Sequence, residues 1–206
     1  MKISDFDAII FDLGGVILPI DYNKTADAFK ELGLTNFDEL YSQANQSGLF
    51  DRFEIGEISA QHFVNSILDY LPSQSNANKV VAAWNAMLLD FPKENLEFLA
   101  EVKSQNRTFL LSNTNEIHVQ AFNRKLKNLV EKESLHPYFE HVYFSNEIGK
   151  RKPHPETFAY ICEINNLNPK NTLFIDDSIQ HIEGAKKTGL QTYHIQKDEK
   201  IIDILR

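Results

Sequence analysis

The chain contains 206 residues, of which 42% are hydrophobic, and it carries a formal net charge of −8. These values predict one folded domain with an insertion, or two small domains; they exclude a disordered chain and argue against nucleic acid and anionic membranes as partners. The single cysteine, Cys162, excludes an intrachain disulfide bond, and the sequence shows no signal peptide or membrane-spanning run, so we expect a cytoplasmic protein. We also expect a monomer or a weak homodimer.

The first predicted element is a strand at residues 8–11. Its sequence, Ala-Ile-Ile-Phe, is continuously apolar, which is typical of a strand covered on both faces in a parallel sheet. Asp12 follows directly and is therefore expected at the carboxyl end of a central strand, where open α/β sheets bind their ligands. Gly14 and Gly15 then allow the backbone to turn sharply and to approach a ligand closely.

Residues 21–90 carry helical patterns and no strand pattern. We therefore expect an all-helical cap domain at residues 21–90, inserted into an α/β core formed by residues 1–20 and 91–206. Because the insertion leaves from the end of the first strand, it is placed over Asp12, where it can act as a lid. Its predicted helices cover residues 22–32, about 35–47, 60–71 and 80–89.

From residue 92 onward, short apolar strands alternate with amphipathic helices. This alternation predicts a parallel sheet joined by right-handed crossovers, so the fold class is α/β with a Rossmann-like core. The predicted strands cover residues 108–112, 142–145, 172–176 and 191–195, and the predicted helices cover residues 92–105, 116–130, 155–166 and 182–187.

Polar residues that can bind a metal or a phosphate follow three of the predicted strands: Asp12, Ser112–Asn113 and Asp176–Asp177. Lys152 lies in a basic segment between the third strand and its helix. Because the carboxyl ends of parallel strands meet at one edge of a sheet, we expect these side chains to lie together. Crowded carboxylates need a cation, and their hard oxygen ligands suit Mg²⁺, whereas a lysine and a hydroxyl beside that metal suit a phosphoryl group.

These positions resemble the four motifs of the haloacid dehalogenase superfamily, and the resemblance covers most of the core. Asp12-Leu13-Gly14 resembles the first motif, Ser112 the second, Lys152 the third, and the pair Asp176-Asp177 the fourth. Each motif alone is weak, but four in the right order at strand ends are specific. The helical insertion is similar to the cap of the family's first subclass, and the motifs look most like the sugar-phosphatase branch that includes α-D-glucose-1-phosphate phosphatase.

The resemblance implies a Mg²⁺-dependent phosphatase that acts on a small phosphorylated metabolite, such as a sugar phosphate, through an aspartyl-phosphate intermediate. It implies that Asp12 is the nucleophile, that Ser112 and the Asn113 backbone hold the phosphoryl oxygens, and that Lys152 neutralises both Asp12 and the phosphate. The implied metal ligands are the Asp12 carboxylate, the Gly14 carbonyl, Asp177 and, as a second or orienting group, Asp176.

Gly14 departs from the family pattern, in which an Asp at this position supplies both a metal-binding carbonyl and the general acid/base side chain. Gly14 keeps the carbonyl but lacks the side chain, and positioned acid/base groups are worth about 10²–10⁴-fold in rate. The sequence offers four substitutes, of which we expect the first two to be near enough to the site: His118, Asp21, Glu54 and Glu57. A second departure is His181, where the family usually has Asp or Asn, and it affects only the outer shell of the metal site.

Two other functions stay open. The 2-haloacid dehalogenase branch also lacks the second Asp, but it typically carries Tyr there and needs no metal, and the acidic pair Asp176–Asp177 would repel its anionic substrate. Gly14 is also compatible with a non-catalytic regulatory protein that holds metal and phosphate without turnover. The identity of the phosphorylated substrate does not follow from the sequence.

Overall fold

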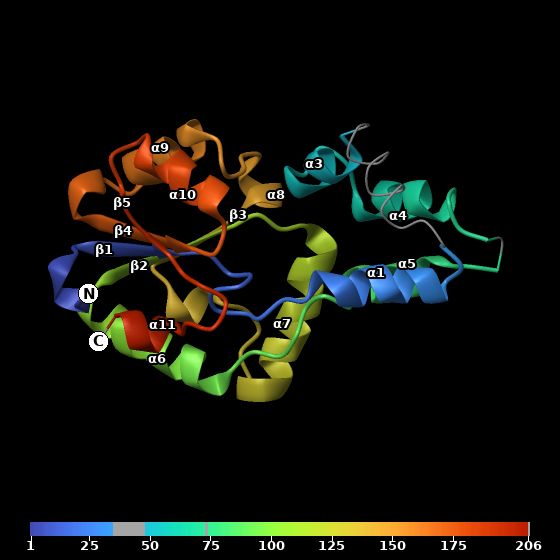
Figure 1. Ribbon diagram of the computed structural model, residues 1–206, viewed down its shortest axis with the longest axis horizontal. Helices are drawn as coiled ribbons and strands as arrows, with labels where there is room; N and C mark the ends of the chain where they lie inside the picture. The colour runs from blue at the N-terminus through green and yellow to red at the C-terminus, as the bar shows by residue number, and fades with distance from the viewer. Residues whose placement is uncertain (35–47, 73, 206) are drawn as a thin grey trace.

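The computed structural model describes residues 1–34, 48–72 and 74–205 of the chain (Figure 1). They form a five-stranded sheet whose neighbouring strands are all parallel, and helices flank the sheet on both faces. The predicted α/β class with a Rossmann-like core is therefore confirmed. The strands, in their order across the sheet, are β3 (His141–Phe144), β2 (Arg107–Ser112), β1 (Ala8–Phe11), β4 (Thr172–Asp176) and β5 (Gln191–His194).

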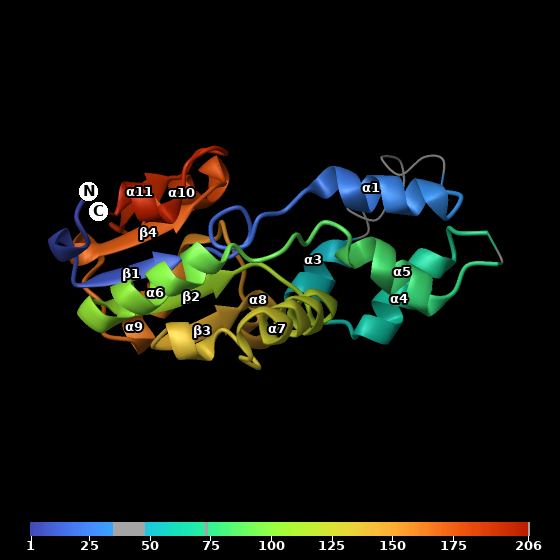
Figure 2. The same ribbon diagram turned by 90° about the horizontal axis from the view of Figure 1, so that it is seen from below.

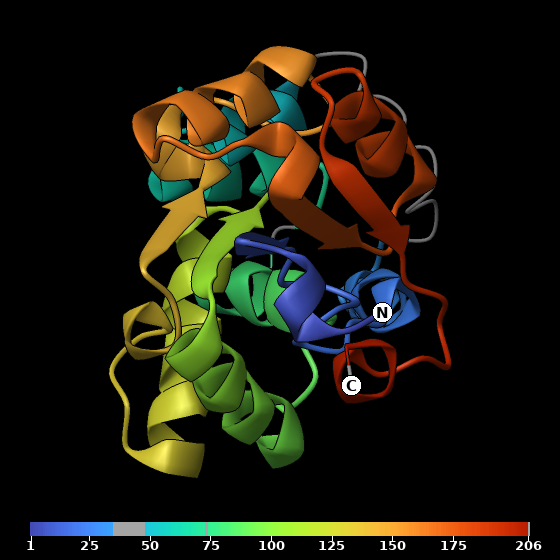
Figure 3. The same cartoon turned by 90° about the vertical axis from the view of Figure 1, so that its left-hand side faces the viewer.

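The central strand β1 is buried on both faces, as its continuous apolar sequence predicts. Ile9 and Phe11 pack into one hydrophobic cluster, whereas Ala8 and Ile10 pack into another. The view along the sheet shows the helices that cover the two faces (Figure 3). The first face is covered by α6 (Lys93–Gln105), α7 (Glu116–Val130) and α11 (Ile201–Ile204), and the second by α9 (Pro155–Ile164) and α10 (Ile179–Lys186).

The insertion forms most of a third hydrophobic cluster, to which Ile117 of α7 also belongs. Phe53 and Phe63 lie at its centre, with ring centroids 4.3 Å apart, and Phe29 and Val80 are buried beside them. Figure 2 shows these helices extending away from the end of the sheet. They are α1 (Tyr22–Glu31), α3 (Leu49–Glu54), α4 (Ala60–Leu68) and α5 (Ala77–Asn85).

The two segments that connect the insertion to the sheet are hydrogen-bonded to each other. Asp21 N donates to Met87 O at 2.9 Å, and Leu89 N donates to Pro19 O at 3.1 Å. The hydroxyl of Thr25, in α1, also donates to Trp84 O at 3.2 Å and accepts from Met87 N at 3.1 Å. The entry and exit of the insertion therefore form one paired connection directly above the carboxyl end of β1.

Several element bounds differ from the sequence prediction. The helix predicted at residues 80–89 is α5, which begins earlier because the Asn76 side chain caps it, and ends earlier because residues 87–89 pair with the other connecting segment. Ser145, predicted as the end of a strand, instead begins the short helix α8 (Ser145–Ile148). The helix predicted at about residues 35–47 lies outside the described residues.

The sequence did not predict several short elements, namely α3, α8, α11 and the 3₁₀ helices at Ile3–Asp5, His136–Tyr138 and Pro169–Asn171. Each spans six residues or fewer, so its periodicity is too brief to be recognised. In the part of the chain that the structure describes, no helix combines the length and the apolar character needed to cross a bilayer.

Candidate active site

The carboxyl ends of β1, β2 and β4 open into a cleft of about 810 Å³ between the sheet and the insertion. Asp12, Ser112, Asn113 and Asp177 line the cleft from the core. Lys152 lies beneath them with a fully buried side chain. The structure thus brings the separate strand-end residues and the lysine to a single place.

A buried network of ion pairs forms the floor of this cleft. Lys152 Nζ lies 2.8 Å from Asp12 Oδ1 and 2.6 Å from Asp176 Oδ2. On the other side, His181 Nδ1 lies 2.9 Å from Asp176 Oδ1. Burial opposes the charge on Lys152, but the two carboxylates outweigh it and raise the pKa of the amine above its usual value. Lys152 is therefore a fixed positive charge beside the predicted nucleophile.

The carboxylates of this floor do not ionise equally easily. Burial raises the pKa of Asp12, and the charge of Asp176 adds to this effect. Burial acts in the same direction on Asp176, but Lys152 and the hydrogen bond from His181 lower the pKa of that carboxyl. Burial, followed by the charge of Asp176, also raises the pKa of Asp177. One ammonium group faces three carboxylates, so a further cation would favour their ionised forms.

The groups present fit a hard divalent cation. Asp12, Asp176 and His181 each offer a donor atom, and these atoms lie within 4.8 Å of one another. Gly14 lines the cleft next to Asp12. Asp177 packs so closely against Gly15 that a Cβ added to this glycine, whose φ is +75°, would overlap the carboxylate. The carboxylate oxygens of the two aspartates suit Mg²⁺, whereas the hydrogen bond from His181 orients Asp176.

Asn113 has a structural role that the sequence did not reveal. Its Nδ2 donates to Lys152 O at 2.9 Å, and its Oδ1 accepts from Lys152 N at 2.9 Å. This pair of bonds ties the end of β2 to the backbone of Lys152. Ser112, by contrast, ends β2 and lines the cleft, in the position expected for a phosphate-binding hydroxyl. Sequence patterns carry no signal for the Asn113 contact, because its partner is 39 residues away.

Of the four residues considered as substitutes for the missing acid/base group, His118 and Glu54 line the cleft. Asp21 instead caps α1, where its Oδ1 accepts from Asn23 N at 3.1 Å. Glu57 is exposed, and its Oε2 lies 3.7 Å from Arg52 Nε. The sequence ranked Asp21 ahead of Glu54 as the nearer group, and the structure reverses that order.

His118 lies at the start of α7 and joins the core to the insertion. Its Nδ1 lies 2.9 Å from Asn85 Oδ1, and its ring stacks on Trp84 with centroids 5.3 Å apart. Trp84 in turn stacks on Phe50, with centroids 5.4 Å apart. Burial lowers the pKa of His118 to about 3, so its ring is neutral at physiological pH.

Arg151 joins the loop that contains Lys152 to helix α3 of the insertion. Its guanidinium group forms ion pairs with Asp51 and, at 3.0 Å, with Glu54 Oε2. Arg151 also lines the cleft and directly precedes Lys152. In the sequence this residue is indistinguishable from a solvated basic turn, and only the packing of α3 gives it partners.

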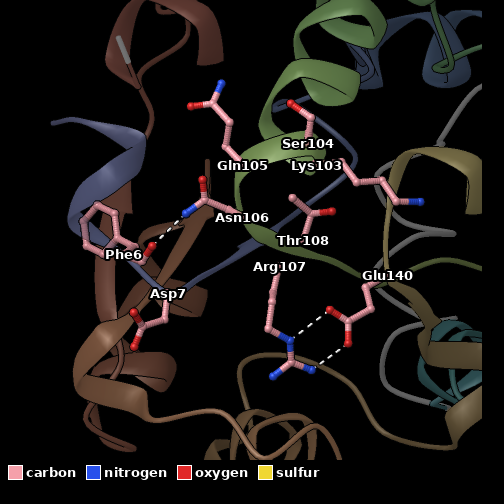
Figure 4. Close-up of a pocket in the computed structure, with 9 residues that line it drawn as sticks. All are labelled: Phe6, Asp7, Lys103, Ser104, Gln105, Asn106, Arg107, Thr108 and Glu140. Atoms are coloured by element: carbon pink, nitrogen blue, oxygen red, sulfur yellow. Dashed lines mark hydrogen bonds and ion pairs between the residues drawn. The ribbon is translucent and has the colours of Figure 1, made fainter.

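A second depression, of about 570 Å³, lies at the opposite edge of the sheet (Figure 4). Two of its charged groups pair with each other: Arg107 forms hydrogen bonds of 2.9 and 2.6 Å with Glu140. Asn106 Nδ2 donates to Phe6 O at 2.7 Å, and Lys103 Nζ donates to two backbone carbonyls. These pairings are structural, and none of the predicted site residues lines this depression.

Comparison with known proteins gives the same family as the motifs. The family model described as haloacid dehalogenase-like hydrolase matches residues 6–189. The chain is 30% identical over 185 residues to the D-ribitol-5-phosphate phosphatase of Bacteroides thetaiotaomicron, covering 90% of this chain and 89% of the relative. It is 24% identical over 193 residues to the phosphorylated carbohydrates phosphatase of Thermotoga maritima, covering 90% of this chain and 82% of the relative.

A solved structure shows how far the similarity extends. The crystal structure of a haloacid dehalogenase family enzyme from Bacteroides thetaiotaomicron, in complex with magnesium and inorganic phosphate, matches with a TM-score of 0.89 and 31% identity. The match covers 98% of this chain and all of that chain. The narrower resemblance to the α-D-glucose-1-phosphate phosphatase branch stays a prediction. The matched model, the relatives and the shared fold together show that this chain belongs to the haloacid dehalogenase-like hydrolases.

Proposed function

We propose that this protein is a Mg²⁺-dependent phosphatase that hydrolyses a small phosphorylated metabolite, specifically a sugar or polyol phosphate. The observation that carries the proposal is the buried Lys152, whose Nζ lies 2.8 Å from Asp12 Oδ1 at the floor of the cleft. Two relatives that each cover 90% of this chain act on ribitol 5-phosphate and on phosphorylated carbohydrates, which supports the substrate class.

The side chains suggest a two-step reaction. Asp12 attacks phosphorus and displaces the sugar or polyol oxygen, and water then hydrolyses the aspartyl-phosphate. Lys152 holds Asp12 in place and neutralises charge on the phosphoryl group, while Ser112 donates a hydrogen bond to a phosphoryl oxygen. Asp12, the Gly14 carbonyl and Asp177 would hold Mg²⁺, with Asp176 as a second or orienting group. The bound ion would spread the negative charge of the phosphoryl group.

We infer that residues 21–90 act as a cap domain over a core of residues 1–20 and 91–206. A hydrophobic cluster to which these residues contribute every buried member except Ile117 supports this division. Cap residues, including Phe50 and Trp84, line the cleft opposite the catalytic residues, so they are placed to select among substrates. A cytoplasmic location and a monomeric or weakly dimeric state stay predictions.

The acidic floor disfavours the dehalogenase alternative. Asp176 and Asp177 lie beside the predicted nucleophile, where the carboxylate of a haloacid would have to approach. A phosphate ester with its own divalent cation tolerates this environment much better. Under the regulatory alternative, the protein would bind metal and phosphate but would show no turnover in a phosphatase assay.

A phosphatase assay tests the proposal. In the presence of Mg²⁺ we expect turnover of 4-nitrophenyl phosphate and faster turnover of D-ribitol 5-phosphate or another sugar phosphate, and we expect EDTA to abolish both. Asp12→Asn should remove activity by at least about 10³-fold, because the nucleophile is lost. Full activity in Asp12→Asn would contradict the assignment of the nucleophile. Vanadate binding without turnover in the wild type would support the regulatory alternative.

A further inference from the structure

The cleft lacks a proton donor at Gly14, and the insertion supplies a carboxyl group on the opposite wall. We propose that Glu54 is the general acid/base of this enzyme: it protonates the leaving-group oxygen and later accepts a proton from the attacking water. The proposal rests on the phosphatase function proposed above, and it adds a catalytic residue that lies on the cap instead of the core.

The position of Glu54 supports this role. It ends helix α3, and it lines the same cleft as Asp12 and Asp177. Its Oε2 lies 3.0 Å from Arg151 Nη2, and Arg151 directly precedes Lys152 on the catalytic loop. Arg151 therefore acts as a positioning residue that holds the end of α3 over the floor of the cleft.

The surroundings of Glu54 favour a carboxyl group that can hold a proton. Burial raises its pKa, and this effect outweighs the opposing charge of Arg151. The other charged groups that act on it are Asp51, which raises the pKa, and Lys152, which lowers it. Arg151 is shared with Asp51, so its charge is not available to Glu54 alone. A raised pKa suits a group that must give up and regain a proton near neutral pH.

The rival groups are less suitable. His118 lines the cleft, but burial lowers its pKa to about 3, so it carries no second proton to donate at neutral pH. Asp21 is engaged as the cap of α1, and Glu57 is exposed beside Arg52. Among the candidates within the described residues, Glu54 alone combines a place in the cleft with a raised pKa.

The proton balance of the two steps is complete. When Asp12 attacks, the bond from phosphorus to the leaving oxygen breaks, and the electron pair on that oxygen takes the proton of Glu54 to form an alcohol. Glu54 is then a carboxylate. When water attacks the aspartyl-phosphate, the bond from phosphorus to the Asp12 oxygen breaks, and the proton of the water returns to Glu54. Because Glu54 belongs to the cap, the acid is in place only when the cap covers the cleft.

The decisive experiment compares two esters of similar shape whose leaving groups differ in basicity, phenyl phosphate and 4-nitrophenyl phosphate. The more basic phenolate leaves slowly unless a group donates a proton to it, whereas nitrophenolate depends much less on a proton donor. In Mg²⁺ we expect Glu54→Gln to lower kcat/KM, which reports the steps up to departure of the leaving group, by about 100-fold or more for phenyl phosphate and by less than about 10-fold for 4-nitrophenyl phosphate. Glu57→Gln is the matched control, since it makes the same change three residues away on an exposed side chain, and it should retain wild-type rates.

The pH profile supplies a second readout that a purely structural role would not change. For phenyl phosphate, the wild-type kcat/KM should fall as rising pH deprotonates Glu54, and Glu54→Gln should lack this falling part of the pH profile. Asp51→Asn should move the falling part to lower pH, because it removes a charge that raises the pKa of Glu54 and leaves Arg151 to Glu54 alone. Circular dichroism melts of each variant confirm that the protein is folded.

The outcomes separate this proposal from the proposed function. Equal losses of kcat/KM for both esters in Glu54→Gln, no loss for either, or an unmoved falling part of the pH profile in Asp51→Asn would overturn the role of Glu54 while leaving the phosphatase intact. If the wild type hydrolyses neither ester in Mg²⁺, the proposed function fails, and the role of Glu54 fails with it.

Discussion

At the scale of a single residue, His118 shows how burial couples the site to stability. The folded protein holds this imidazole neutral, with a pKa of about 3 caused by burial. An unfolded chain protonates histidine near pH 6.5. The contribution of His118 to stability is therefore fully present above about pH 6.5 and is lost as the pH falls from there toward 3, because only the unfolded state gains the proton.

This linkage predicts a specific loss of stability in mild acid. Between pH 7 and pH 5, His118 should account for about 2 kcal/mol of the decrease in the free energy of unfolding. We expect His118→Gln to lack that component in urea titrations at the two pH values, whereas His62→Asn, which alters an exposed histidine, should behave like the wild type. Identical losses in the wild type and His118→Gln would show that His118 titrates normally in the folded protein.

At the scale of an element, the placement of α3 depends on a close backbone contact with α8. Gly56 follows α3 with φ +75°, and a Cβ added there would overlap the carbonyl oxygen of Asn146. Gly48, at the other end of α3, also has a positive φ, +67°, but nothing described lies within 4 Å of its added Cβ. Both glycines therefore have a left-handed backbone conformation, but only Gly56 lies against the backbone of α8.

The pair provides a matched test of the α3–α8 contact. Both Gly→Ala changes should cost about 1–2 kcal/mol for the left-handed conformation, and Gly56→Ala should lose about 1–3 kcal/mol more because the methyl group forces α3 and α8 apart. Since α3 carries Glu54, Gly56→Ala should also lower kcat/KM further than Gly48→Ala does. Equal unfolding free energies for the two variants, measured in urea, would mean that the contact is not tight.

At the scale of the whole molecule, the sheet and the insertion meet over a floor with excess negative charge. Asp12, Asp176 and Asp177 face one ammonium group, and the chain as a whole has a net charge of −8. A cation that binds this floor only in the folded state must stabilise the whole protein by mass action, by about 2.7 kcal/mol at a concentration 100 times its Kd.

Mg²⁺ should therefore raise the Tm of the wild type, and EDTA should reverse the increase. Asp177→Asn should reduce the shift, because it removes one of the proposed ligands. Asp198→Asn, which makes the same charge change at an exposed position, is the control and should keep the full shift. A Tm that does not respond to millimolar Mg²⁺, followed by differential scanning calorimetry, would contradict the proposed metal site.

Local pattern alone was enough to predict the fold class and the candidate residues that the structure brings together at the cleft. The continuous apolar run of β1 is visible in the sequence because both faces of a central parallel strand are buried. Asp12, Ser112 and Asp176 are visible because each follows or ends such a run, and the carboxyl ends of parallel strands share one edge. These features depend on neighbours within one segment, which the sequence records directly.

Contacts between distant segments were decided only by the tertiary structure. Asn113 fixes the backbone of Lys152 across 39 residues, and Arg151 binds Asp51 across 100 residues. The same packing places Glu54 in the cleft and leaves Asp21 as a helix cap. No periodicity reports on these contacts, because they depend on how the insertion folds back over the sheet, and that arrangement is set by the burial of side chains from many separate elements at once.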